Sequence, residues 1–254
     1  MEGTHDRWHH DIVVLRADNP RSSERCSAAR TRRAVTLWLA ASAIAALCLG
    51  AEPLLAQAAR ASGPPWRIPL VFHVVQREGV AVAPPSFIAE QLAAARAIYG
   101  PLGIELVERE GAPLGAQHAE LITRADRDAL SAQVHKGEIH CFIVAKLMDV
   151  DEPGRERRGV HWRPRPAPER SFLIVSQISK PYVLAHELGH WFGNREHSDV
   201  PGNLMSYTRT EQPPWLDAAQ IQRVQRTLAE MLRSGKLVAL PSAPPAGPPP
   251  PAGR

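Results

Sequence analysis

The sequence predicts an α+β fold, in which helices pack against a mixed, twisted β-sheet. Apolar, β-branched stretches typical of buried strands recur along the middle of the chain, and segments with apolar residues at helical spacing lie between and after them. Of the 254 residues, 44% are hydrophobic and 22% are charged, which is ordinary for one globular domain with extra segments at its ends. We therefore expect a single domain over residues 67–238.

The N-terminal 58 residues have the pattern of a leader with a secretory signal. Residues 1–33 are polar and Arg-rich, residues 34–50 are apolar and uncharged, and small residues follow at Ala56-Gln57-Ala58. This order is typical of a signal peptide, so we expect cleavage after Ala58 and export to the periplasm or the medium. The alternative is a membrane anchor that stays uncleaved, because the apolar stretch is only slightly shorter than the ~20 residues that span a bilayer.

The remaining composition adds few constraints. Residues 59–66 form a linker, and residues 239–254 form a Pro-rich tail that we expect to be disordered. Cys26 and Cys48 fall in the leader, so Cys141 has no disulfide partner in the domain and we expect a buried core thiol. The net charge of +4, with no basic run interleaved with aromatics, argues against nucleic acid as a partner. We expect a monomer.

The domain is predicted to begin with a strand and a long helix. Ile68 to Val75 is β-branched and aromatic, as in a buried strand, and we expect its lone His73 to be structural rather than a ligand. Ser86 is the expected N-cap of the helix, which runs for about three to four turns. Gly100-Pro101 ends it.

The segments that follow alternate between strands and a short helix. We expect strands at 103–107, 138–147 and 171–176, a short helix at 126–133 and a final helix from Trp215 to about Arg233. Between them, Asp149 to Arg158 is a charged stretch whose three arginines we expect to be solvated.

The most specific stretch is a predicted helix that begins near Pro181-Tyr182. On a helix, His186 and His190 lie four residues apart on one face, so both imidazoles reach one metal ion while Glu187 stays beside it. A catalytic zinc needs three protein ligands and one open position for the water that it activates. The third ligand is therefore expected close by.

Gly193 indicates where the third ligand lies. A glycine at this place can adopt the left-handed conformation that ends a helix and turns the chain back toward the metal. Two residues just beyond it, Glu196 and His197, compete for the role.

The stretch from His186 to Tyr207 resembles the metzincin family of zinc endopeptidases, whose motif is H-E-x-x-H-x-x-G-x-x-H followed by a Met-containing turn. The third ligand of that motif falls on Glu196, and His197 comes one residue later. We favour His197 because imidazole is the usual ligand there, and Glu196 is the alternative.

The resemblance implies roles for three further residues. Glu187 would be the general base, and Met205 would form the structural turn beneath the metal. Tyr207, two residues after Met205, would stabilise the tetrahedral intermediate, or else it is a packing tyrosine, since a phenol can do either.

The resemblance also implies a metzincin-like single catalytic domain with a substrate-binding edge. Gly159 to Trp162 takes the place of the antiparallel edge strand on which metzincins bind an extended peptide. A surface edge without a ligand is the alternative. The expected function is that of an exported zinc-dependent endopeptidase. A catalytically weak zinc-binding domain that acts as a protein-binding module is the other hypothesis.

Overall fold

A computed structural model describes residues 65–241. The predicted leader, with its signal peptide and cleavage site, and the tail beyond residue 241 lie outside the described residues and stay predictions. In the described range, no helix is both long enough and apolar enough to cross a bilayer. Leu240, at the start of the predicted tail, donates its backbone N–H to the Arg67 carbonyl at 2.8 Å.

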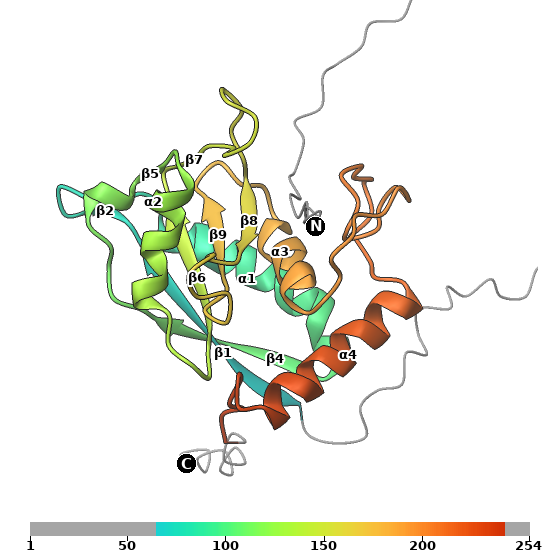
Figure 1. Ribbon diagram of the computed structural model, residues 1–254. Coiled ribbons are helices and arrows are strands. Elements are labelled where there is room, and N and C mark those ends of the chain that lie inside the picture. The colour runs from blue at the N-terminus through green and yellow to red at the C-terminus, as the bar shows by residue number, and fades with distance from the viewer. Residues whose placement is uncertain (1–64, 242–254) are drawn as a thin grey trace, which may run out of the picture. The chain divides into compact units, whose positions relative to one another are not determined.

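A five-stranded sheet in the order β4-β1-β6-β9-β8 forms the centre of the domain (Figure 1). Its strands in this order are Ile104–Glu110, Trp66–Val74, Ile139–Val144, Phe172–Ser176 and Gly159–Trp162. The first four are mutually parallel, and β8 pairs antiparallel with β9 at the edge of the sheet. The predicted α+β class and the predicted edge strand at Gly159–Trp162 are therefore confirmed.

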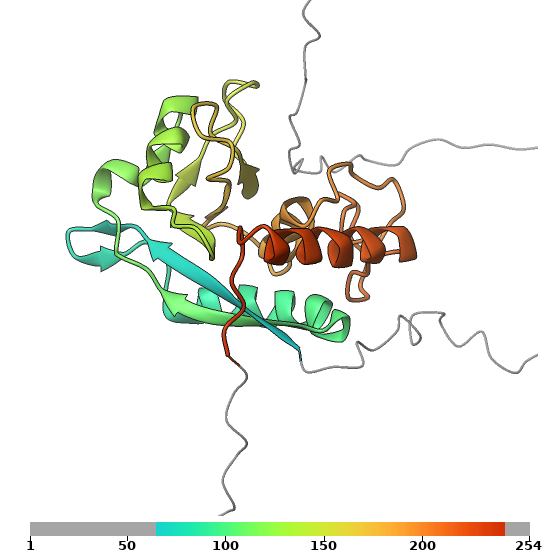
Figure 2. The ribbon, with the colours of Figure 1, turned by 60° about the horizontal axis from the view of Figure 1, so that its bottom comes forward.

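The helices lie on both faces of this sheet (Figure 2). On one face, α1 (Pro85–Tyr99) and α3 (Val183–Trp191) pack against the strands, whereas α2 (Arg124–Ala129) lies over the other face. The C-terminal helix α4 (Ala218–Arg233) completes the first of these two layers. Two further sheets have two short strands each. They pair β2 (Gln76–Arg77) with β3 (Val80–Ala81) and β5 (Glu120–Leu121) with β7 (Lys146–Leu147).

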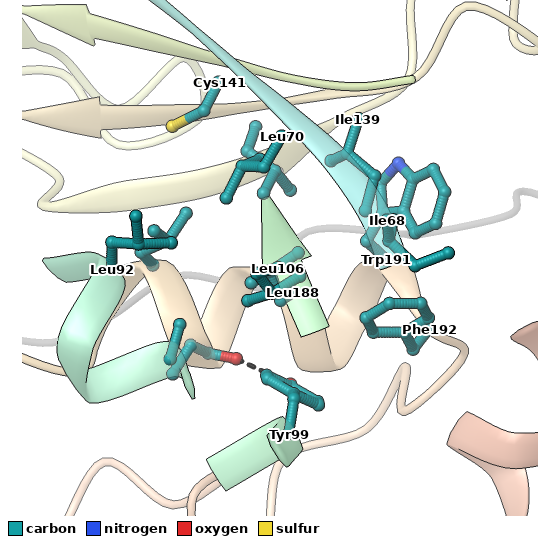
Figure 3. Close-up of a cluster of buried hydrophobic side chains, with 14 of the residues drawn as sticks. Ile68, Leu70, Leu92, Tyr99, Leu106, Ile139, Cys141, Leu188, Trp191 and Phe192 are labelled. Atoms are coloured by element: carbon teal, nitrogen blue, oxygen red, sulfur yellow. Dashed lines mark hydrogen bonds between the residues drawn. The ribbon is translucent and has the colours of Figure 1, made fainter. Parts of the chain in front are cut away.

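The larger core lies between the sheet and the layer of α1 and α3. Because side chains alternate along a strand, Ile68 and Leu70 of β1 point to the same face, where they meet Leu188 and Trp191 of α3 (Figure 3). Cys141 lies in the same core, fully buried and free, as predicted. The metal-binding sequence thus sits on a helix that the core holds.

Three predicted helix starts are wrong, and in each case a local signal explains the shift. The first helix begins at Pro85 with Pro84 as N-cap and no side-chain cap, so Ser86 is not the cap; the fixed φ of proline suits the first helical position. The second begins at 124, where Thr123 and Asp126 form a capping box, and the last begins at 218, where Asp217 and Gln220 form another.

The expectation that the arginines of the loop before β8 are solvated is wrong for Arg157. This side chain is buried and forms an ion pair with the equally buried carboxylate of Asp149. A buried guanidinium requires such a partner. The two residues are eight positions apart in a loop, so helix or strand periodicity could not predict that they pair.

Candidate metal centre

Helix α3 carries the candidate site, and α1 fixes its first turn. The helix starts after Tyr182, whose φ is +73°, and all of its residues are buried. Gln91 of α1 accepts the Leu184 N–H at 3.0 Å, and the Tyr99 hydroxyl donates to the Ala185 carbonyl at 2.8 Å. The first bond satisfies one of the N–H groups that have no partner inside a helix at its start, and both bonds hold α3 in register with α1.

Three histidines converge at the C-terminal part of α3. The Nε2 atoms of His186 and His190 lie 3.1 Å apart, and each lies 3.2 to 3.3 Å from Nε2 of His197. Two nitrogens bound to one tetrahedral zinc at about 2.0–2.1 Å would lie about 3.3 Å apart. The triangle of ring nitrogens therefore has the size that a zinc ion requires.

The opposite ring nitrogens are anchored by the protein. His186 Nδ1 donates to the Leu204 carbonyl at 2.7 Å, and His190 Nδ1 donates to the Asn194 carbonyl at 2.8 Å. Because a carbonyl only accepts, Nδ1 carries the hydrogen of each ring. In the neutral ring Nε2 then carries no hydrogen and can only accept a hydrogen bond or bind a metal ion. Burial holds the pKa of His186 well below its usual range, which keeps this ring neutral. The two Nε2 lone pairs, 3.1 Å apart, repel each other unless a cation lies between them.

The third position of the triangle is occupied by His197, and Glu196 is exposed on the loop outside it. Gly193 has the positive φ expected from the sequence, +97°, and the following Asn194 donates its N–H to the Gly189 carbonyl at 2.9 Å. The turn at Gly193 thus starts the loop that returns His197 to the helix. His197 Nδ1 lies 3.1 Å from the Tyr207 hydroxyl.

Glu187 projects from the same helix beside the triad. Its side chain is buried, and its Oε2 atom has no hydrogen-bond partner among the described residues. Burial raises the pKa of this carboxyl to about 8, against the lowering effects of the His161 backbone N–H and of Arg157 and Arg127. A bound dication would also favour the ionised form, which is the form that accepts a proton.

Met205, the residue of the expected turn, packs directly against Gly189 of α3. It is fully buried, and a Cβ placed on Gly189 would come within 2.5 Å of its sulfur. The glycine therefore leaves the space that the methionine fills. Asn203 shapes the turn by accepting the Met205 N–H at 2.9 Å through its side-chain oxygen.

Sequence reasoning missed the polar residues that link this turn to α4. The amide of Gln220 exchanges hydrogen bonds of 2.8 and 3.1 Å with the amide of Asn203, and all of these atoms are buried. Gln220 also caps α4 together with Asp217. The D-x-x-Q capping signal was readable in the sequence, but its contact with Asn203 was not.

The edge strand β8 runs against α3 at the site. A Cβ on Gly159 would lie 2.9 Å from Glu187 Oε1 and 2.6 Å from Val183, so the strand backbone approaches the helix closely. β8 ends the strand order of the sheet, and its outer side pairs with no other strand among residues 65–241. An open backbone edge therefore lies next to the candidate metal centre.

Solved structures share this fold. Mature mirolysin of Tannerella forsythia, in complex with a cleaved peptide, matches 68% of this chain and 99% of its own at 12% identity and a TM-score of 0.50. A promirolysin mutant matches with 12% identity and a TM-score of 0.52 over 68% of this chain and 83% of its own. Metalloproteinase-II of Bacteroides fragilis, with 18% identity and a TM-score of 0.45 over 65% of this chain, is matched over 55% of its length. Archaemetzincin of Methanopyrus kandleri, with 18% identity and a TM-score of 0.41, is matched over 98% of its length and 66% of this chain.

What the chain shares with mirolysin, at TM-scores of 0.50 and 0.52, is the fold. The expected metzincin-like domain is thus confirmed at the level of architecture. No protein-family model matches the sequence, and a comparison with curated proteins finds no match.

Proposed function

We propose that the protein is a zinc-dependent endopeptidase in which His186, His190 and His197 hold the metal. The observation that supports this most is the triangle of Nε2 atoms, 3.1 to 3.3 Å on a side, beside a buried carboxylate. Three imidazole nitrogens suit zinc, and three protein ligands leave one position open for chemistry.

Glu187 is the proposed general base. A zinc ion bound by the triad supplies Lewis acidity, which lowers the pKa of a water and polarises a carbonyl. Glu187 Oε2, which has no hydrogen-bond partner among the described residues, accepts the proton of the attacking water and passes it to the leaving amine. The close packing of β8 on α3 shields this carboxylate from bulk water.

The open side of β8 is the proposed binding edge for an extended peptide. The His161 N–H on this side is bonded to Glu187, and the other outer N–H and C=O groups can pair with a substrate backbone by strand addition. Gly159 lies against Glu187, so a strand added there would pass beside the proposed base. We further propose that the enzyme is exported by the signal-like residues 34–50.

Replacement of Glu187 by Gln tests the role of the base. The amide keeps the shape of the side chain but cannot take up a proton, so we expect zinc content to be retained and casein hydrolysis to fall by about 10²–10⁴-fold. The measurements are metal analysis and initial rates with and without a chelator. Full activity in the Gln variant, or cleavage that a chelator does not affect, contradicts the proposal.

The same assay separates the enzyme from the binding-module hypothesis. A zinc-loaded wild-type protein that binds peptides but cleaves none across a broad peptide library would favour the module. The intact carboxylate at position 187 is the feature that favours the enzyme.

A further inference from the structure

The face of β8 that is turned to α3 carries a row of residues that the proposed mechanism does not use. Gly159, His161 and Arg163 alternate along the strand and its continuation, so they share one face, whereas Val160 and Trp162 pack in the core on the opposite face. Gly159 lies over Glu187. The row therefore leads away from the proposed base toward the C-terminal end of α3.

His161 is the first side chain of this row beyond the base. Its Nε2 atom is buried and has no hydrogen-bond partner among residues 65–241. The imidazole interacts electrostatically with His190 and with three cations, Arg163, Lys236 and Arg195. A buried ring nitrogen without a partner is costly, and a ligand that supplies one would relieve that cost.

The three cations gather where β8 and α3 end. Lys236 Nζ lies 5.5 Å from the centroid of the Trp191 ring. Burial and Arg195 lower the pKa of Arg163, and burial and Arg163 lower the pKa of Lys236, so these charges repel one another. Glu169 partly offsets the charge of Lys236.

We infer that the surface formed by His161, Arg163, Arg195 and Lys236 binds a carboxylate of the peptide substrate, beside the scissile bond. The inference rests on the proposed peptidase function, because it assumes a peptide laid along β8. A carboxylate would balance the positive charge of Arg163 and Lys236, and it would provide an acceptor for an N–H of the buried His161 imidazole. We refer to these four residues as the carboxylate surface.

The same cations could instead serve only the fold, since positive charges near the C-terminal end of a helix stabilise its dipole. That role predicts a loss of stability when they are reversed, but no change in substrate preference. A carboxylate can come from an acidic side chain or from the free C-terminus of a peptide. The experiment therefore separates both sources and both roles.

Matched fluorogenic peptides provide the test, with Glu or Gln placed in turn at each position around one scissile bond, and with a free or amidated C-terminus. Arg163→Glu and Lys236→Glu are compared with Arg77→Glu, a charge reversal on the β2–β3 hairpin, which lies away from α3 (Figure 1). We expect the zinc-loaded wild type to prefer Glu at one position by about two- to fivefold in kcat/KM, a range typical of one partly exposed charge pair.

Both reversals at the carboxylate surface are expected to abolish this preference, whereas Arg77→Glu is expected to keep it. Higher salt is expected to weaken it. A preference for the free C-terminus over the amide, with none for internal Glu, would assign the carboxylate to a peptide end. If the enzyme is active but cleaves both members of every Glu/Gln pair and of every acid/amide pair at equal rates, the inference is overturned and the proposed function stands.

Peptide affinities measured on the zinc-loaded Glu187→Gln protein keep the test independent of turnover. Absence of hydrolysis in the wild type, together with tighter binding of the carboxylate peptides, would overturn the proposed function but support the carboxylate surface. Equal affinities within every peptide pair would overturn the inference, whatever the activity.

Discussion

Two clusters of histidines among residues 65–241 differ in what their ring nitrogens face. In the cluster on α3, the three Nε2 atoms point at one another, and each Nδ1 meets an oxygen of the protein. In the second cluster, His73 of β1 and His140 of β6 are stacked, with ring centroids 5.3 Å apart. Both clusters bring imidazoles into contact, but only the first has the geometry of a metal site.

The nitrogens of the second cluster are all committed to one hydrogen-bonded chain. The His135 backbone N–H donates to His140 Nε2 at 3.0 Å, so the hydrogen of that neutral ring is on Nδ1, which donates to His73 Nε2 at 3.0 Å. His73 Nδ1 then donates to the Ala112 carbonyl at 3.0 Å. The prediction that His73 is structural is confirmed.

The difference shows that proximity of histidines does not make a metal site. What matters is that the outer nitrogens are anchored by acceptors while the inner nitrogens converge without a hydrogen between them. In the His73–His140 pair each ring passes its hydrogen to the next acceptor, and a metal ion could bind only by breaking the chain. The following predictions test this contrast.

The largest contrast is expected in zinc content. His190→Ala removes one of three converging donors, so we expect zinc to fall to background and peptidase activity to be lost. His140→Gln removes a histidine of the other cluster, and we expect zinc content to remain that of the wild type. Metal analysis of both purified proteins measures this, with circular dichroism to verify folding. Loss of zinc in the Gln variant alone would reverse the assignment of the two clusters.

The third corner of the triangle gives the next contrast. His197→Ala should weaken zinc binding strongly, because two remaining imidazoles hold the ion poorly, whereas Glu196→Ala should leave it unchanged, because Glu196 is exposed outside the triangle. Zinc affinity by competition with a chromogenic chelator is the measurement. Metal loss only in the Glu196 variant would show that the loop rearranges when zinc binds.

The His73–His140 pair should make the fold sensitive to acid. Burial and the neighbouring His73 lower the pKa of His140 to about 4, whereas an unfolded histidine titrates near 6.5. The unfolded chain therefore binds the proton first, and stability is lost as pH falls from about 6.5 toward 4, by on the order of 3 kcal/mol.

Urea denaturation of chelator-treated protein at several pH values measures this effect without the metal. The control is the pH dependence of the unfolding free energy of His140→Gln. This variant retains the contributions of His161 and His186, whose pKa values are also lowered by burial. Equal slopes in the two proteins would show that His140 does not carry the effect.

The smallest effect is expected from Tyr207, whose hydroxyl lies 3.1 Å from His197 Nδ1. A neutral His197 that binds metal through Nε2 carries its hydrogen on Nδ1, so the hydroxyl would accept that hydrogen and orient the ring. Tyr207→Phe should then lower zinc affinity by about tenfold, the lower end of what such partners contribute. Unchanged zinc affinity with reduced kcat would instead favour contact with the tetrahedral intermediate.

Local sequence signals accounted for much of the fold. The bounds of β8, Gly159–Trp162, match the prediction, as does the end of the last helix at Arg233. The starts of the second and last helices were missed although their signals, T-x-x-D from Thr123 and D-x-x-Q from Asp217, are present in the sequence. The buried pair of Arg157 and Asp149 had no such signal, because it depends on how a loop folds back.

The sequence by itself determined the helix, the shared face of His186 and His190, and the turn at Gly193, because each depends on backbone periodicity or on one residue's conformational freedom. Only the tertiary structure decided that His197 rather than Glu196 reaches the triangle, since a one-residue difference in a loop leaves no periodic trace. The tertiary structure also decided which oxygens anchor the imidazoles. The His186 anchor joins α3 to the Leu204 carbonyl beside Met205, and side-chain bonds from Asn194 and Asn203 join both segments to Gln220 of α4. Only packing brings these segments together.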